Sequence, residues 1–290
     1  MIYEYFTDIF PYEKFPVEYE CYKQLKDYKD LNYIAIPWTQ IMNSTWLNFP
    51  GRQHRDYYFR ILSKEKIQQH NNFTICQHDS YMDLQLYFKH FNITKVFSPL
   101  HDTANAIDGI EIIPIPFTSN FNFDQTTKDI LFSFVGTYTS HTIREKMKNR
   151  IIGENIIYRN SYHIDDNTFG NINSKEKEEI EYRNILQRSR YSLCPRGSSP
   201  SSVRFWESLQ AGAIPILISD NWMLPDWDWS NTIIHIKETD FDKMTYKDIK
   251  ALLDNITPIN EQQMRANCIH AYSSFKKENF TNYIRKYIIK

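Results

Sequence analysis

The stretch that most constrains the fold is Tyr191–Asp220, with the sequence YSLCPRGSSPSSVRFWESLQAGAIPILISD. Its two ends, Arg190–Cys194 and Ala213–Ser219, are short apolar runs of the kind that form buried strands. Between them lie a loop rich in glycine and serine and a segment of helical character, Pro200–Gln210. Two strands joined through a helix run parallel in one sheet. The stretch therefore predicts a βαβ unit.

The ends of this helix carry recognisable signals. Ser199 is suited to cap the helix, and Pro200 suits the first helical position, where the backbone N–H is unpaired in any case. Gly212 stands where a left-handed residue commonly ends a helix. We therefore expect the helix to begin at Pro200 and to end just before Gly212.

The remainder of the chain also alternates between strand-like and helical segments. Helical character is expected over Arg55–His70 and Asn173–Arg190. Short runs rich in Ile, Val or Phe predict buried strands at Asn32–Trp38, Asn72–Asp79, Ile93–Pro99, Gly109–Phe117 and Ile130–Tyr138. This alternation predicts the α/β class, with helices on the faces of parallel sheets.

A chain of 290 residues is longer than one ordinary domain, so we expect two domains. The polar stretch Thr118–Asp129 lacks helical periodicity and is interpreted as the linker. The predicted division is an N-terminal domain over residues 1–120 and a C-terminal domain over residues 121–270. Residues 271–290 are expected to form a C-terminal helix that packs back on the N-terminal domain.

The loop of the βαβ unit has the chemistry of an anion site. In a parallel sheet, ligands bind at the carboxyl ends of the strands, where helix N-termini present free N–H groups. Arg196 and the serines add a positive charge and hydroxyl donors, which suits a phosphate or diphosphate. Glu207, roughly 10 Å further along the helix, could accept hydrogen bonds from a ribose. A nucleoside diphosphate satisfies both features.

Two simpler interpretations stay open at this level. The serines could form an ordinary surface loop, and Arg204 and Glu207, three residues apart, could form a surface salt bridge. The loop matches neither the phosphate-binding loop of nucleoside triphosphatases nor the dinucleotide fingerprint.

Composition excludes several classes of function. A net charge of -1 gives no basic surface for nucleic acid or anionic lipid. The N-terminus lacks the pattern of a signal peptide, and nowhere do about 18 uncharged apolar residues run together, so no integral membrane segment is expected. The cysteines have no metal-binding spacing and are expected to be free, two of them buried in strand-like runs; they are Cys21, Cys76, Cys194 and Cys268.

From Tyr191 through the following LPDWDWS, the chain closely resembles the exostosin family of glycosyltransferases. The family signature has a Cys-Pro-Arg-Gly loop, a Ser-Pro-Ser pair, an Arg-Phe-aromatic-acid helix and an Ala-Gly-x-Ile-Pro strand, and each part is found here without a gap. Upstream, LFSFVGTYTSHTIREKM is similar to the Phe-x-Gly turn and Arg-bearing helix of the family. The resemblance covers about Asn72–Asp240 and is firm from Leu131 onward.

The resemblance implies a GT-B architecture, in which two Rossmann-like domains face each other across a cleft. The second domain holds the donor, usually a UDP-sugar, and the first domain holds a glycan acceptor. The anomeric centre is inverted, and most members need no metal ion and no other cofactor. The triplet Asp226–Asp228 is accordingly interpreted as a packing and capping element and not as a metal site.

The resemblance also names the residues of the donor site. Inverting transfer requires that the departing diphosphate be stabilised. Arg144 lies at the matching place on the upstream helix, and Glu207 is expected to bind the ribose. The predicted donor-binding residues are Arg144, Arg196, Gly197, Ser198, Ser199, Ser201, Ser202, Arg204 and Glu207.

The catalytic base is expected from the N-terminal domain, just past the end of a strand. Asp79 is the first choice and His78 the second. An alternative is that Asp79 merely caps the following helix. Rival candidates are His54 with Asp56, and His101 with Asp102.

Three functional hypotheses follow. The first is a UDP-sugar-dependent inverting glycosyltransferase that acts in glycan or polysaccharide synthesis. The second keeps the fold but uses GDP-fucose, because the FVGTY turn and its helix are also similar to fucosyltransferases. The third is a catalytically silent partner subunit. The chain begins almost directly with the fold, from which we expect a cytoplasmic enzyme of a bacterium or of a virus-infected host cell.

Overall fold

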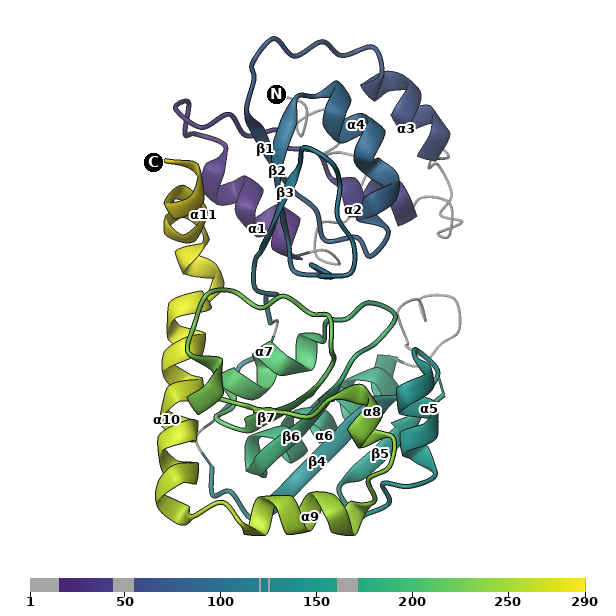
Figure 1. The fold of residues 1–290 in the computed structure, drawn as a ribbon, viewed down its shortest axis with the longest axis vertical. Coiled ribbons are helices and arrows are strands. Elements are labelled where there is room, and N and C mark those ends of the chain that lie inside the picture. The colour runs from purple at the N-terminus through teal and green to yellow at the C-terminus, as the bar shows by residue number, and fades with distance from the viewer. Residues whose placement is uncertain (1–15, 44–54, 120, 125, 161–171, 290) are drawn as a thin grey trace. The chain divides into compact units, whose positions relative to one another are not determined.

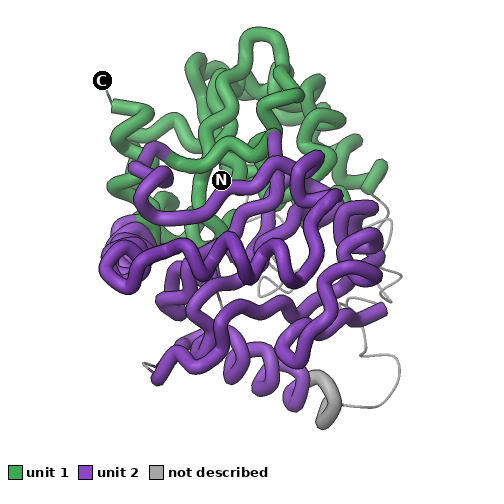
Figure 2. The backbone as a smooth tube through the Cα atoms, turned by 60° about the horizontal axis from the view of Figure 1, so that its bottom comes forward, with its two compact units in different colours: residues 1–118, 221–225, 275–290 green, residues 119–220, 226–274 purple. Residues whose placement is uncertain are grey.

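A computed structural model describes residues 16–43, 55–119, 121–124, 126–160 and 172–289. The chain divides into two compact units (Figure 2). Unit 1 comprises residues 1–118, 221–225 and 275–290, and unit 2 comprises residues 119–220 and 226–274. Each unit is built around its own parallel sheet (Figure 1).

The sheet of unit 1 has three strands in the order β1-β2-β3, all parallel. The strands are β1 (Asn72–Ile75), β2 (Ile93–Ser98) and β3 (Glu111–Pro114). The helices of this unit are α1 (Pro16–Leu25), α2 (Trp38–Asn43), α3 (Arg55–Leu62), the 3-10 helix η3 (Tyr81–Leu84), α4 (Gln85–His90), the 3-10 helix η5 (Lys277–Asn279) and α11 (Phe280–Ile288).

Both faces of this sheet are covered. Successive side chains on a strand point to opposite faces, so the neighbours Val96 and Phe97 of β2 enter two different apolar clusters. Val96 packs with Phe88 of α4, whereas Phe97 packs in the cluster that contains residues of α1 and α11. Because both faces are buried, β1 has four buried residues in succession, as expected for a parallel sheet.

The sheet of unit 2 has five parallel strands in the order β5-β4-β6-β7-β8. The strands are β4 (Ile130–Thr137), β5 (Ile156–Arg159), β6 (Ser189–Pro195), β7 (Ile214–Ile218) and β8 (Ile234–His235). The helices are α5 (Thr142–Lys148), α6 (Ile172–Arg188), α7 (Val203–Gln210), the 3-10 helix η4 (Trp229–Asn231), α8 (Glu238–Phe241), α9 (Tyr246–Asp254) and α10 (Pro258–Phe275), whose last residue belongs to unit 1.

The predicted α/β class is confirmed. In particular, β6, α7 and β7 form the βαβ unit expected from the sequence, with Tyr191 opposite Ile214 in adjacent parallel strands. Gly212, with φ +64°, is the left-handed residue that ends α7. A GT-B architecture consists of two units of this kind in one chain.

The predicted start of α7 is wrong by three residues. The helix begins at Val203, and Ser202 is the flanking residue with extended backbone angles. The first backbone hydrogen bond of the turn runs from Phe205 N–H to the Ser202 carbonyl. Upstream, the Ser199 and Ser201 hydroxyls bond to each other at 3.0 Å. Ser199 and Pro200 therefore precede the helix and belong to the loop.

Two further predicted elements differ from the structure. The strand expected over Asn32–Trp38 is a single β-bridge, Tyr33 to Phe73, because the chain turns into α2 at Trp38. The helix expected over Arg55–His70 ends at Leu62. Beyond that point Ile67 is the only apolar residue before His70, which leaves no continuous apolar face to bury.

Candidate functional site

The candidate site in unit 2 lies where β4, β6 and β7 end. Because the strands are parallel, their carboxyl ends share one edge of the sheet. Three loops leave from this edge, namely Tyr138–His141 after β4, Arg196–Ser202 after β6 and the turn at Asp220 after β7. The predicted donor-binding residues lie on these loops or on the helices that follow them.

Arg144 of α5 is a framework residue of this edge. Its side chain is 2% exposed, so Arg144 is not a charge on the helix surface. The guanidinium donates to the carbonyls of Thr137 at 3.3 Å, Pro195 at 2.8 Å and Arg196 at 2.7 Å. A single buried cation thus joins the ends of β4 and β6 and fixes where the serine loop begins.

Arg196 has hydrogen-bonding capacity to spare. Its Nη1 lies 3.7 Å from Oε1 of Glu238 in α8, and within the described part of the chain its Nε is buried without a hydrogen-bond partner. Glu238 is held in turn, since its Oε1 accepts from the Asp220 N–H at 3.1 Å and its own N–H donates to Asp220 Oδ1 at 3.0 Å. Arg196 is therefore oriented by one carboxylate and retains an unused donor.

The residues that follow Arg196 differ in accessibility. Ser198 is exposed, whereas Ser201 and Ser202 are 5% and 7% exposed. A Cβ at Gly197 would lie 3.6 Å from the Arg144 guanidinium, an ordinary contact, so glycine is not sterically required there. In the neighbouring loop, the Ser140 hydroxyl is buried and lacks a partner among the described residues.

Arg204 lies against β4 and is half-buried. Its Nη2 donates to the Val135 carbonyl, and its guanidinium lies 4.4 Å from the centre of the Phe134 ring. Gly136 makes this approach possible, because a Cβ there would clash with Arg204 Nη2. Gly136 belongs to the FVG motif. In the sequence, the glycine of this motif indicated the turn that ends the strand.

Glu207 is buried, with 7% of its surface exposed. It accepts a hydrogen bond from the Tyr182 hydroxyl of α6, and burial raises the pKa of its carboxyl group. The surface salt bridge considered between Arg204 and Glu207 is therefore wrong. Tyr182 was not predicted as a site residue, since an isolated tyrosine in a charged helix gives no sequence signal.

The second candidate group lies in unit 1, where β1 ends. His78 is mostly buried: its Nδ1 accepts from the Ser80 N–H at 3.0 Å, and its Nε2 lies 3.2 Å from Oδ1 of Asn43 in α2. Nδ1 is thus an acceptor, so Nε2 carries the proton that Asn43 accepts. Burial lowers the pKa of His78, which favours this neutral form.

Asp79 is the accessible member of this pair. Its side chain is 45% exposed, and its Oδ1 lies 3.4 Å from His78 Nδ1. The next helix, η3, has Ser80 as its capping residue and no side-chain cap, so the alternative role of Asp79 as a helix cap is wrong. Both ring nitrogens of His78 are engaged, which leaves Asp79 as the group able to receive a proton.

The rival candidates are placed differently. His54 lies outside the described residues, and Asp56 is 70% exposed on α3 beside Arg55. Asp102 accepts from the Ala104 N–H at 2.9 Å, the bond of an Asx turn. Burial lowers the pKa of the neighbouring His101.

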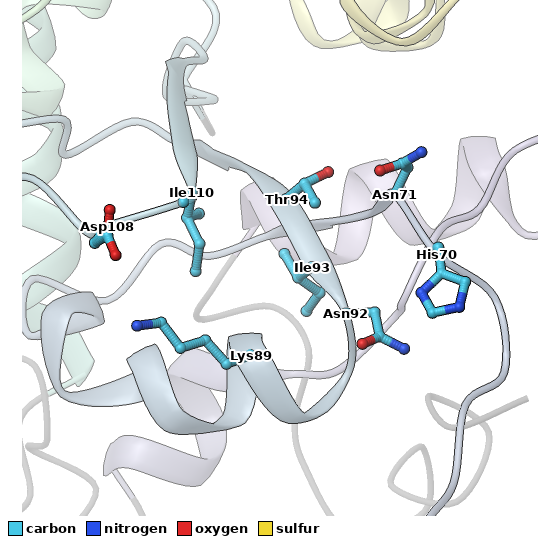
Figure 3. Close-up of a pocket in the computed structure, with 9 residues that line it drawn as sticks. His70, Asn71, Lys89, Asn92, Ile93, Thr94, Asp108 and Ile110 are labelled. Carbon is cyan, nitrogen blue, oxygen red and sulfur yellow. The ribbon is translucent and has the colours of Figure 1, made fainter.

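One hollow of about 330 Å³ lies at the opposite edge of the unit 1 sheet (Figure 3). It is formed around the segments that lead into β1, β2 and β3, and the side chains of Ile93 and Ile110 lie among polar side chains there (Figure 3). Its lining residues are His70, Asn71, Lys89, Asn92, Ile93, Thr94, Asp108, Gly109 and Ile110. Since ligands of parallel sheets bind at the carboxyl ends of the strands, this hollow is not the candidate site.

Asp228 of the Asp-Trp-Asp triplet is a structural residue. It accepts from the Ser230 hydroxyl at 2.6 Å and from the Asn231 amide at 2.9 Å, and these bonds lower its pKa. Among the described residues, no three His, Cys, Asp or Glu side chains gather as a metal site would require. No helix in the described ranges combines the length and the apolar character needed to cross a membrane.

The family model of the exostosin GT47 domain matches residues 53–251. The chain belongs to the exostosin GT47 family. The matched range contains β1 to β8, both candidate groups and all the predicted site residues, so the family resemblance inferred from the sequence is confirmed.

Among curated relatives, exostosin-1 of Drosophila melanogaster is 41% identical over 68 residues, which are 22% of this chain and 9% of that protein. The exostosin-1 homolog of Caenorhabditis elegans is 40% identical over 68 residues, 18% of its length. The matched stretch therefore spans less than a fifth of either exostosin.

Solved structures resemble the chain only loosely. The pneumococcal O-GlcNAc transferase GtfA, in complex with UDP and GlcNAc, aligns with 82% of this chain and 47% of its own at 14% identity, with a TM-score of 0.36. TarM aligns with 81% of this chain and 57% of its own at 10% identity, with a TM-score of 0.40. Likenesses of this degree carry no argument about function.

Proposed function

We propose that this exostosin-family chain is an inverting glycosyltransferase that transfers a sugar from a UDP-sugar to a hydroxyl group of a glycan acceptor. The observation that carries the proposal is the carboxyl edge of the unit 2 sheet. There, Arg196 has an oriented guanidinium with an unused donor, beside a loop of hydroxyl and N–H groups. This arrangement suits a diphosphate.

In the proposed reaction, the bond between the anomeric carbon and the diphosphate oxygen breaks while the acceptor oxygen forms the new bond from the opposite face. The negative charge that develops on the departing UDP is stabilised by Arg196 and by donors of the loop Gly197–Ser202. Arg144 stabilises this charge indirectly, because its donors hold the carbonyls that set the loop. Glu207 binds the ribose, and Arg204 supports β4 beside it.

Asp79 is the proposed base that removes the proton of the acceptor hydroxyl. Its carboxylate is exposed while the residues on either side of it are held by hydrogen bonds, which suits a group that must meet a substrate. His78, neutral and protonated on Nε2, orients this segment. The proton taken by Asp79 returns to solvent after transfer.

Transfer is proposed to need no metal ion or other cofactor, since arginines and N–H groups take the part that a divalent cation plays in other transferases. A cytoplasmic location, in a bacterium or a virus-infected host cell, belongs to the same proposal.

The test is calorimetry of the protein with UDP, GDP and dTDP, with and without EDTA. Binding of UDP alone, unaffected by EDTA and weakened in Glu207→Ala, is the expected result. Selective binding of GDP would replace the UDP-sugar by GDP-fucose. Binding of no nucleotide would overturn the proposed donor site and favour a silent partner subunit. As a matched control, Glu179→Ala changes an exposed carboxylate of α6 and is expected to bind UDP normally.

A further inference from the structure

Glu18 of α1 is a buried carboxylate that the proposed reaction does not use. Its side chain is 1% exposed, in a helix that packs on the sheet of unit 1. Its Oε1 accepts three hydrogen bonds: from the Thr39 hydroxyl at 2.6 Å, the Gln77 N–H at 2.8 Å and the Thr39 N–H at 3.2 Å. One oxygen therefore joins α1 to the first turn of α2 and to the segment that follows β1.

The same segment is held a second time. The Val17 N–H of α1 donates to Oε1 of Gln77 at 3.0 Å, so both the backbone and the side chain of Gln77 are bound to α1. At the other end of α2, Asn43 meets Nε2 of His78 at 3.2 Å. Glu18 thus acts on the residue two positions before Asp79, and through α2 on the histidine beside Asp79.

Burial of a carboxylate is costly unless the group is paired or hydrogen-bonded, and the three bonds to Oε1 offset part of this cost for Glu18. An apolar side chain would fill the space beside Cys21 and Cys76, the buried thiols that interact with Glu18. It could not, however, accept the Gln77 N–H and the two donors of Thr39. The contribution that only a residue like Glu18 can make is to accept these hydrogen bonds. The bonds in turn fix the position of the segment that follows β1.

We infer that Glu18 is a positioning residue, which fixes the orientation of Asp79 by holding Gln77 directly and His78 through α2. This inference rests on the proposed role of Asp79 as the base. An acceptor hydroxyl is deprotonated efficiently only when the base is in place, and a displacement of about 1 Å can lower the rate about 100-fold.

The pair Glu18→Met and Glu18→Gln tests the inference. Methionine has a similar length and no oxygen, so it removes all three bonds, whereas glutamine can keep its Oε1 where the three donors meet. Both variants are assayed for UDP release from UDP-glucose, UDP-galactose and UDP-N-acetylglucosamine with oligosaccharide acceptors. We expect Glu18→Met to lower kcat about 10- to 100-fold with an unchanged Kd for UDP, and Glu18→Gln to stay within about threefold of the wild type.

A second readout does not depend on activity. Nitrogen-15 NMR of the His78 ring, assigned with a His78→Asn variant, reports which ring nitrogen carries the proton. We expect the wild type and Glu18→Gln to show the Nε2–H form, and Glu18→Met to lose this pattern as Asn43 and Ser80 shift. Unchanged His78 signals together with an unchanged kcat in Glu18→Met would overturn the inference.

Should Glu18→Met fail to fold, Thr39→Val removes one of the three donors and Thr39→Ser keeps it; a loss of the His78 pattern in Thr39→Val alone supports the inference, and identical spectra in both overturn it. Should the wild type transfer no sugar, the proposed function fails, while the NMR comparison still decides whether Glu18 holds the segment.

Discussion

The two sheet edges of this protein use opposite chemistry. The edge of unit 2 collects donors: buried Arg144 bound to main-chain carbonyls, Arg196 with a spare N–H, and a loop of hydroxyls. The edge of unit 1 collects acceptors: Asp79 in solvent and, behind it, buried Glu18. Hydrogen-bond donors at an edge can stabilise a departing anion, whereas carboxylates at an edge can accept a proton. Under the proposed function, parallel sheets of the same kind supply donors for the departing diphosphate in unit 2 and an acceptor for the proton in unit 1.

The largest expected effect separates the two edges. Asp79→Asn removes the proposed base and is expected to lower kcat about 10³-fold, within the range for general-base catalysis. Because the change lies in unit 1, the Kd for UDP is expected to stay within about twofold of the wild type. The measurements are steady-state kinetics and calorimetry, with Asp83→Asn of η3 as the matched control. A joint loss of kcat and UDP binding would contradict a division of labour between the edges.

The next effect concerns the buried carboxylate. Burial raises the pKa of Glu18 from 4.5 to about 7, so between these values the folded protein holds a proton that the unfolded chain has released. The Glu18 contribution to stability is therefore fully present below pH 4.5 and is lost as pH rises to about 7, by about 3 kcal/mol.

Urea denaturation of the wild type and Glu18→Gln, from pH 4.5 to 8, measures this loss. The difference in the free energy of unfolding between the two proteins is expected to shift in favour of Glu18→Gln as pH rises, since glutamine does not titrate. A difference that is constant with pH would show that Glu18 keeps an ordinary pKa. The chemical difference between the edge of unit 1 and the donor-bearing edge of unit 2 would then be smaller.

A smaller effect tests the packing at the donor edge. Gly136→Ala places a methyl group against the Arg204 guanidinium, which must leave the Val135 carbonyl and the face of Phe134. We expect a loss of about 1–3 kcal/mol in the stability of the protein, as for other overpacked sites. Thermal denaturation measures the loss, and the double variant with Arg204→Ala is expected to recover most of it. A single variant as stable as the wild type would indicate that Arg204 moves freely.

The smallest effect concerns the pair of Tyr182 and Glu207. Tyr182→Phe removes the hydroxyl that donates a hydrogen bond to the Glu207 carboxylate. The buried carboxylate is then left with one hydrogen-bond partner fewer. We expect the Kd for UDP to rise about 3- to 10-fold, equivalent to about 1 kcal/mol, with kcat little changed. Tyr138→Phe, in the loop after β4, is the matched control. An unchanged Kd for UDP in Tyr182→Phe would contradict the proposed role of Glu207 in binding the ribose.

The parts of the fold that the sequence predicts are those with a short-range physical signal. The β6-α7-β7 unit was predictable because two apolar runs bracket an amphipathic helix, and Gly212 has the left-handed conformation that its position suggested. The start of α7 was not predictable, because Ser199 and Ser202 are both of the residue type that commonly flanks a helix start, and the sequence does not distinguish between them.

The same distinction applies to the candidate site. Arg196 and the serines are contiguous in sequence, so their grouping could be seen directly. Glu18 meets Gln77 across 59 positions of the chain, and Glu238 meets Arg196 across 42, and no local pattern records such pairs. Charged residues of this kind resemble ordinary surface positions until the fold buries them.

The way Arg144 is bound has a consequence for the descent of such enzymes. Three of its bonds go to main-chain carbonyls, which every amino acid possesses, so a side-chain substitution at Thr137, Pro195 or Arg196 leaves a carbonyl in place for each of these bonds. The residues that face a substrate are then free to change without unfolding the frame beneath them. Under the proposed function, the side chains that face the sugar can therefore differ between related enzymes while an arginine at this place holds the same loops.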